Sequence, residues 1–160
     1  MMNKKTNRCL SIWSSIVVDN SIAVFKRYDS LHPLDFYLGI DSDGARLLLL
    51  ICSAEPPAQP DMKGIGFRKS LREDGKWTLL LLLKDPKLLE IFSMLCQDLI
   101  DYSDERISCE GYYSVLTRLG CWRKLLERNL NVILSNSEIR GLIGELSALK
   151  LLVNQIGALT

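Results

Sequence analysis

Apolar residues in the first 30 positions of the chain are spaced for a helix. Five of them fall at intervals that fit one helical face: Trp13, Ile16, Val17, Val24 and Tyr28. The β-branched run at 16–18 and the polar pair Asn20-Ser21 are less favourable in a helix. The spacing nevertheless predicts an N-terminal helix over residues 10–28.

Four short apolar runs follow, and turns containing Asp-Gly join them in pairs. The runs are 35–40, 46–53, 65–72 and 76–83. Gly44 ends the first turn and Gly75 the second, and Asp-Gly between apolar runs is typical of a β-hairpin. The three prolines in 55–60 predict an exposed connection between the hairpins. The pattern predicts a mostly antiparallel four-stranded sheet, whose leucine runs require burial on both faces or one tightly covered face.

Three amphipathic helices are predicted after the sheet. The first begins near Pro86, since proline fits the first helical turn, and the second carries an apolar stripe through 112–126. The third opens at 135–138 with a Ser-x-x-Glu capping box. We therefore expect an α+β fold: an N-terminal helix, a four-stranded mostly antiparallel sheet built from two hairpins, and then three helices packing on it. Residues 1–134 are the predicted N-terminal module, and residues 135–160 are a long amphipathic helix.

Composition and charge exclude several classes of protein. The chain has 160 residues, of which 48% are hydrophobic, and its formal net charge is +1. These values fit one globular domain and exclude a strongly basic nucleic-acid-binding arm or an acidic tail. No run reaches the roughly 18 apolar residues that a membrane-spanning helix needs. The five cysteines are widely spaced, with no Cys-x-x-Cys pair, so we expect free thiols, a cytoplasmic location and no membrane partner.

The sequence offers little for covalent catalysis or for zinc. His32 is the only histidine, and it precedes Pro33 in a predicted turn. A catalytic cysteine would depend on this one imidazole as its base. The scattered cysteines form no recognisable tetrahedral zinc set. We expect Cys96 and Cys121 to pack as small apolar residues, because both fall within helical patterns.

One group of basic residues raises the question of nucleic acid. Arg68, Lys69 and Arg72 in the third predicted strand can contact phosphates. Glu73 and Asp74 offset their charge, and this favours a solvated strand face. The second predicted helix also interleaves aromatic and basic residues, a combination on which the bases of single-stranded nucleic acid can stack. Its aromatic residues align with the leucine stripe, so we prefer to assign them to the core.

The third predicted helix contains two glycines, each of which costs about 1 kcal/mol relative to alanine. With a nearby alanine they form a smooth strip that another backbone can approach closely. We expect an interface formed by this strip and the apolar residues beside it: Gly141, Gly144, Ala148, Leu149, Leu152 and Ile156. Glu145 lies next to the strip, and it is either a metal or catalytic group or a partly exposed helix glutamate.

A family resemblance appears at this helix. Residues 141–149, G-L-I-G-E-L-x-x-L, resemble the G-L-x-G-E-L-x-x-L segment of bacterial PD-(D/E)XK motif proteins, which occur among restriction and phage-defence genes. Trp13, the strand at 35–41, the helix at 92–100 and the segment 122–126 follow in the order expected of their N-terminal region. The resemblance covers nearly the whole chain.

The resemblance implies a role for Glu145 as the acid of the first nuclease core helix. In such nucleases a following Asp and an Asp/Glu-x-Lys on adjacent strands complete a Mg²⁺ site that activates water. The sequence ends at Thr160, before those strands, so we expect a fragment of a longer protein. The magnesium expected for the intact nuclease is therefore not expected to bind this chain by itself.

Two hypotheses for function remain. The first is an N-terminal, non-catalytic module of a Mg-dependent restriction-type DNA endonuclease, which positions protein or DNA. The second is an adaptor domain that oligomerises through its C-terminal helix. The expected partners are a second copy of the chain or other defence-system subunits, with weaker support for DNA.

Overall fold

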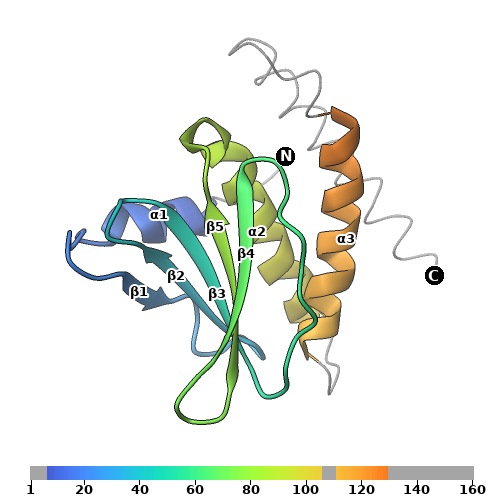
Figure 1. Cartoon of the computed structure of the whole chain (residues 1–160), viewed down its shortest axis with the longest axis horizontal. Coiled ribbons are helices and arrows are strands. Elements are labelled where there is room, and N and C mark those ends of the chain that lie inside the picture. The colour runs from blue at the N-terminus through green and yellow to red at the C-terminus, as the bar shows by residue number, and fades with distance from the viewer. Residues whose placement is uncertain (1–6, 106–110, 130–160) are drawn as a thin grey trace, which may run out of the picture. The chain divides into compact units, whose positions relative to one another are not determined.

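A computed structural model gives the fold of residues 7–105 and 111–129 (Figure 1). The helices are α1 (Arg8–Ser15), α2 (Leu89–Glu105), which follows the 3-10 turn η1 (Pro86–Leu88), and α3 (Gly111–Asn129). The strands are β1 (Val24–Arg27), β2 (Asp35–Ile40), β3 (Arg46–Cys52), β4 (Ile65–Leu71) and β5 (Trp77–Leu83). The chain divides into two compact units, Met1–Arg118 and Leu119–Thr160, and the sheet, α1 and α2 belong to the first.

The strands form one antiparallel sheet in the order β1-β2-β3-β5-β4. The four predicted strands correspond to β2, β3, β4 and β5. The Asp-Gly turns are present, and Gly44 and Gly75 take the positive φ angles of 85° and 83° that suit glycine. The α+β class is thus confirmed, with five strands in place of the predicted four. β3 pairs with β5 and not with β4, so β4 lies at an edge.

The N-terminal helix is shorter than predicted, and the extension of a helix across 10–28 is wrong. α1 ends where Ile16 becomes extended and its N–H bonds the carbonyl of Trp13 at 3.2 Å. Asp19 then accepts hydrogen bonds from the N–H and the hydroxyl of Ser21, which form a local turn. The chain continues into β1, which pairs with β2. The β-branched residues that weaken a helix favour an extended chain here.

The helices after the sheet agree with the sequence pattern. η1 begins at Pro86, and the Asp85 carboxylate caps it by accepting a hydrogen bond from the Lys87 N–H at 3.1 Å. η1 with α2, and α3, correspond to the first two predicted helices. The third, at 135–160, lies outside the described residues, and so does the boundary after residue 134 between the two predicted domains.

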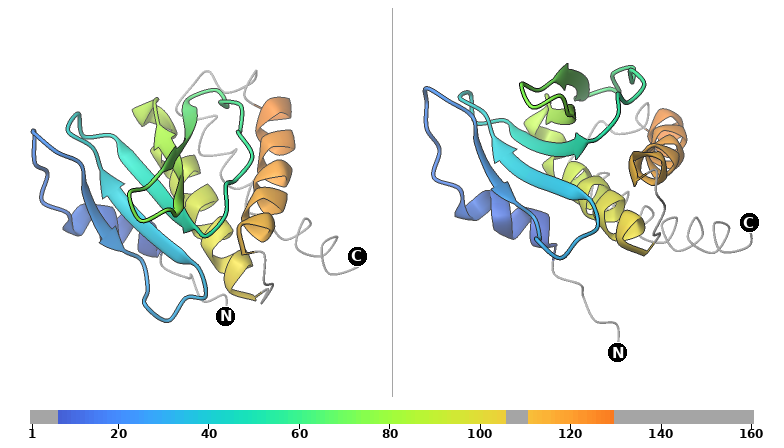
Figure 2. Two further views of the ribbon diagram at one scale, coloured as in Figure 1. Left: turned by 60° about the horizontal axis from the view of Figure 1, so that its bottom comes forward. Right: turned by 90° about the horizontal axis from the view of Figure 1, so that it is seen from below.

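α1 and α2 lie on the same face of the sheet (Figures 1 and 2). Trp13 of α1 joins these layers, because its indole N–H donates to the carbonyl of Leu47 in β3 at 3.2 Å. Its ring stacks on Phe92 of α2, with 5.6 Å between the ring centroids. The central side chains of this sheet face are each at most 2% exposed: Phe36, Leu38, Leu48, Leu50, Leu79 and Leu81. This side of the sheet forms the core.

The opposite face of the sheet is also apolar, but it is less completely buried. By the strand register it carries five large side chains of intermediate exposure: Tyr37, Leu49, Ile51, Leu80 and Leu82. Leu47 on the same face is buried. Of the two arrangements that the leucine runs allow, the first unit therefore has one tightly covered face. We call the other the open face.

A buried ion pair connects α2 to the first part of α3. The Arg118 guanidinium donates two hydrogen bonds to the Asp98 carboxylate, at 2.6 Å from Nε and 3.0 Å from Nη2. The two side chains are only 4% and 3% exposed. The same guanidinium lies over the ring of Tyr102, 4.8 Å from its centroid. Two parallel hydrogen bonds fix the relative orientation of the groups as well as their distance.

Breaking this pair should destabilise the chain strongly. Arg118→Met leaves a buried carboxylate without its cation, so we expect unfolding free energy to fall by about 3–5 kcal/mol. The double variant Asp98→Leu with Arg118→Met should recover most of this loss, since neither charge remains buried. Urea denaturation followed by tryptophan fluorescence measures both values.

The matched control is Arg72→Met, which removes a more exposed ion pair, Arg72 to Asp74, with side chains 40% and 45% exposed. It should change stability by about 1 kcal/mol or less. Equal effects of Arg118→Met and Arg72→Met would contradict the structural role of the buried pair.

Candidate functional site

The predicted site residues fall into two groups. The proposed metal acid Glu145 lies outside the described residues, together with the whole predicted interface: Gly141, Gly144, Ala148, Leu149, Leu152 and Ile156. The structure describes the basic group on β4. Arg68 and Lys69 lie on opposite faces of that strand, and Arg72 follows its end.

Acidic groups lie beside these basic residues. Lys69 Nζ donates to Glu55 Oε1 at 2.8 Å and to the carbonyl of Pro56 at 3.3 Å. Arg72 Nε donates to Asp74 at 3.3 Å. Glu55 precedes Lys69 by 14 residues, so the linear sequence did not identify this pair. Pairing with neighbouring acids leaves little unbalanced positive charge for phosphate.

Asp61 supplies a further carboxylate near Arg68. Lys84 donates a hydrogen bond to one oxygen of Asp61, and the N–H of Phe67 donates to the other at 2.9 Å. These two bonds, the one from Lys84 foremost, lower the pKa of the Asp61 carboxyl, and the charge of Arg68 acts in the same direction. Asp61 therefore stays ionised and offsets basic charge at this edge of the sheet.

The contacts of Lys69 with Glu55 and Pro56, and of the Phe67 N–H with Asp61, also cover the outer edge of β4. The Arg72 N–H bonds the carbonyl of Lys76, and the Lys84 N–H bonds the carbonyl of Gly64. The backbone N–H and C=O groups of the even-numbered residues of β4 therefore point toward β5. The backbone groups of Phe67 and Lys69 must then point away from the sheet. The proline-rich connection runs beside this edge (Figure 1). The carbonyl of Pro56 in this connection accepts a hydrogen bond from Lys69 Nζ. Covering an edge strand with a loop prevents it from pairing with another chain.

The aromatic residues of α3 divide between the interior and the surface. Trp122 is 4% exposed, as expected of a core residue. Tyr112 is partly buried, whereas Tyr113 is exposed, and their rings stack at 4.7 Å between centroids. The buried Trp122 is not available for stacking on bases, which agrees with assigning this stripe to the core.

His32 is a structural residue in the turn between β1 and β2. Its Nδ1 accepts a hydrogen bond from the Leu34 N–H at 2.9 Å. Its Nε2 therefore carries the proton, which it donates to the carbonyl of Ile100 in α2 at 2.8 Å. Because both ring nitrogens are occupied and the side chain is buried, His32 is not a general base for a cysteine.

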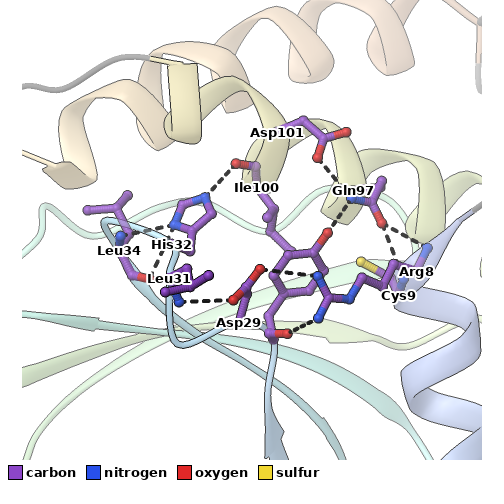
Figure 3. A network of polar contacts seen from close by, with 10 residues as sticks. Arg8, Cys9, Asp29, Leu31, His32, Leu34, Gln97, Ile100 and Asp101 are labelled. Atoms are coloured by element: carbon purple, nitrogen blue, oxygen red, sulfur yellow. Dashed lines mark hydrogen bonds and ion pairs between the residues drawn. The ribbon is translucent and has the colours of Figure 1, made fainter. Parts of the chain in front are cut away.

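Gln97 of α2 holds the beginning of α1 (Figure 3). Its Oε1 accepts hydrogen bonds from the N–H groups of Arg8 and Cys9, at 3.1 and 3.2 Å. Its Nε2 donates to the hydroxyl of Tyr28 at 2.9 Å and to Asp101 at 3.0 Å. These amide contacts satisfy N–H groups that the first turn of a helix leaves unpaired. Gln97 was missed by sequence reasoning, because it lies off the apolar stripe of this helix and its partners Arg8, Cys9 and Tyr28 are distant in sequence.

Arg8 extends the network to the turn after β1 (Figure 3). Its guanidinium bonds Asp29 at 3.2 Å and the carbonyl of Tyr28 at 3.0 Å, and it lies over the Tyr28 ring at 4.6 Å. The Arg8 and Asp29 side chains are 51% and 32% exposed, so this ion pair lies at the surface. The network as a whole anchors α1 and presents no unpaired catalytic group.

Three cysteines of the first unit are buried and unreactive. Burial raises the pKa of the Cys9 thiol to about 12 and that of Cys52 to about 11. Burial likewise raises the pKa of Cys96 well above its ordinary value. Since the thiolate is the reactive form, none of the three is suited to nucleophilic catalysis near neutral pH. Cys96 packs as a small apolar residue, as predicted, whereas Cys121 is only partly buried.

Gln97→Ala should expose Cys9 to alkylation. At pH 8 the native chain should react with iodoacetamide at Cys9, Cys52 and Cys96 only through unfolding or local opening, because their raised pKa values leave little thiolate. Without the Gln97 amide, α1 loses two hydrogen bonds, each worth about 1 kcal/mol, and we expect alkylation of Cys9 to become on the order of tenfold faster. Peptide mass spectrometry over time measures each rate.

The controls are Cys52 in β3, whose rate should not change, and Arg8→Ala, which keeps both N–H contacts to Gln97. Equal acceleration at Cys9 and Cys52 would indicate global destabilisation, and the proposed anchoring role of Gln97 would be wrong.

The described residues do not form a metal site. Within 7–105 and 111–129, no three His, Cys, Asp or Glu side chains are grouped so that they can hold a metal ion. In the same part of the chain no helix has the length and apolar character needed to cross a membrane.

Comparison with known proteins gives one family. Residues 9–159 match the family DUF4420, whose description reads "Putative PD-(D/E)XK family member". The match includes every strand of the sheet and also residues 141–149, which carry the G-L-I-G-E-L segment. No curated protein and no solved structure gave a match to the chain.

Proposed function

Because the chain belongs to this PD-(D/E)XK family, we propose that it is the N-terminal, non-catalytic module of a Mg-dependent restriction-type DNA endonuclease, and that it positions protein. The family match carries the proposal, since it spans both the α+β module and the segment that contains Glu145. The enzyme in this proposal is the intact nuclease, with the cleavage chemistry located outside the described residues.

The surfaces of the first unit favour protein over DNA as the positioned partner. The open face presents leucine, isoleucine and tyrosine side chains that are only partly buried. Such apolar surface is typical of contacts with protein. The basic residues of β4 have Glu55, Asp61 and Asp74 beside them, which weakens the case for a phosphate-binding strip.

Magnesium in this proposal belongs to the intact nuclease. The carboxylates of the described residues do not fit a metal site, so no step of the reaction is assigned to them. By the family resemblance, Glu145 corresponds to the acid of the first core helix. A hard divalent cation takes such oxygen ligands and activates water for phosphodiester cleavage.

The first test is cleavage of supercoiled plasmid by residues 1–160 with millimolar Mg²⁺. We expect no nicking above an EDTA control, because a complete set of metal ligands requires more than Glu145. Nicking that depends on Mg²⁺ and disappears in Glu145→Gln would overturn the non-catalytic assignment.

The coding sequence beyond residue 160 provides a second test. It should contain an Asp followed by Asp/Glu-x-Lys within about one domain length. A stop codon directly after Thr160 would contradict the nuclease-module proposal.

DNA binding distinguishes the two kinds of positioning. We expect the triple variant Arg68→Ala, Lys69→Ala, Arg72→Ala to bind a fluorescent duplex within about twofold of the parent chain at low salt, since acids offset these charges. Fluorescence anisotropy over a salt series measures the affinity, and Arg27→Ala with Lys26→Ala is a matched control on β1. A loss of tenfold or more confined to the β4 variant would favour DNA positioning instead.

A further inference from the structure

The outer edge of β1 has hydrogen-bonding groups available for another strand. β1 lies at one end of the sheet order, and it pairs with β2 through its even-numbered residues, since the Tyr28 N–H bonds the carbonyl of Phe36 at 2.9 Å. The alternation of an antiparallel ladder then points the N–H and C=O groups of Phe25 and Arg27 away from the sheet. Among the described residues, no other strand pairs with this edge.

The two edges of the sheet differ in how they are protected. At β4, the Phe67 N–H already donates to Asp61, and Lys69 holds the proline-rich connection alongside. β1 has no comparable covering among residues 7–105 and 111–129. An uncovered edge is a template for a strand from another chain.

Exposed apolar side chains are frequent in the sequence that leads into β1. Four of the seven large apolar residues that are exposed in the described part of the chain belong to this region: Val17 (85%), Val18 (48%), Ile22 (61%) and Phe25 (39%). Single exposed apolar residues are common on protein surfaces, whereas four of them within nine positions of sequence favour an interface at this end of the sheet.

We propose that β1 pairs with β1 of a second copy of this chain, antiparallel across a twofold axis. The two five-stranded sheets then become one continuous sheet. The proposal concerns how the module assembles, and it does not depend on the nuclease assignment. It places the interface between copies at β1, whereas the sequence pattern placed one in the last predicted helix.

Charge and the extent of β1 together select the register of the proposed pairing. The backbone N–H and C=O groups that point away from β2 belong to the odd-numbered residues of β1. A twofold axis can therefore place Phe25 opposite Phe25 of the second copy, with Lys26 opposite Val24. Moving the axis to the next position places Lys26 opposite Lys26, and moving it again places Arg27 opposite Arg27. Like charges directly opposite each other are destabilising in a sheet. The Phe25 register pairs most of β1 with itself and avoids both repulsions.

The Phe25 register also joins the open faces of the two copies. Phe25 is the cross-strand partner of Gly39, and its side chain lies over that glycine, where a Cβ would come within 2.4 Å of the ring. The ring therefore lies on the same face of the sheet as Tyr37 and Leu49. Pairing of β1 brings two such rings together at the twofold axis, as a cross-strand aromatic pair.

Proline at position 25 tests the pairing without breaking a hydrogen bond of the monomer's sheet. The Phe25 N–H points away from β2, so Phe25→Pro removes no hydrogen bond within the sheet, and proline is tolerated in edge strands at such positions. Phe25→Lys is a second variant, which places two ammonium groups opposite each other. Sedimentation equilibrium on the full chain should give twice the 18.1 kDa monomer mass for the parent. We expect at least tenfold weaker dimerisation for both variants, with unchanged circular dichroism.

The matched control is Leu71→Lys, which removes an exposed apolar side chain from β4, at the opposite edge. It should leave the dimer intact. A parent chain that is monomeric at micromolar concentration would overturn the proposal. A dimer that survives both Phe25 variants would do so too, and it would direct attention to the residues outside the described part.

Cross-linking tests the register itself. Residues in a hydrogen-bonded antiparallel pair have Cα atoms about 5.5 Å apart, within disulfide range. Phe25→Cys should therefore form a covalent dimer on mild oxidation with diamide, whereas Arg27→Cys should not, because Arg27 faces Ala23 in this register. Faster cross-linking through position 27 than through position 25 would show that the register is wrong.

Discussion

The pairing of β3 with β5 determines the arrangement of the first unit. Each strand is a nearly continuous apolar run, and such strands are stable only with neighbours on both sides. Placing them together at the centre of the sheet moves β4 to the edge. The connection from β3 must therefore pass β5 before β4 begins. Its prolines favour an extended path, and the same segment then covers the outer edge of β4 through Glu55 and Pro56.

α2 connects the remaining parts of this unit through two adjacent polar residues. Gln97 bonds the first N–H groups of α1, while Asp98 bonds Arg118 of α3. Neighbouring residues on a helix point about 100° apart, so one turn can serve two different partners. The apolar stripe of α2 supplies burial against the sheet, and the polar pair fixes orientation. Apolar packing alone is less specific, because hydrophobic residues of similar volume can replace one another.

The sequence pattern predicted most of the regular structure but not all of its connections. The Asp-Gly turns and the leucine runs identified β2 to β5, because turn chemistry and local periodicity are properties of short segments. β1 was not identified, since four residues carry little periodic signal and Val24 also fits a helical spacing. The β3–β5 pairing was likewise inaccessible, because it depends on the competition among strands for the centre of the sheet. The basic residues of β4 were evident in the sequence, whereas their partner Glu55 became adjacent only through the fold.

The functional site divides in the same way between local and non-local information. Glu145 was proposed from a nine-residue segment because a family motif is local, and the resemblance places the other metal ligands on strands distant in sequence. The open face is a property of the folded sheet, since consecutive leucines do not reveal which of them a helix covers. If β1 joins two copies, the open faces become one surface with Phe25 at its centre. A partner that binds there would contact both copies, so positioning by this module and its assembly would be thermodynamically linked.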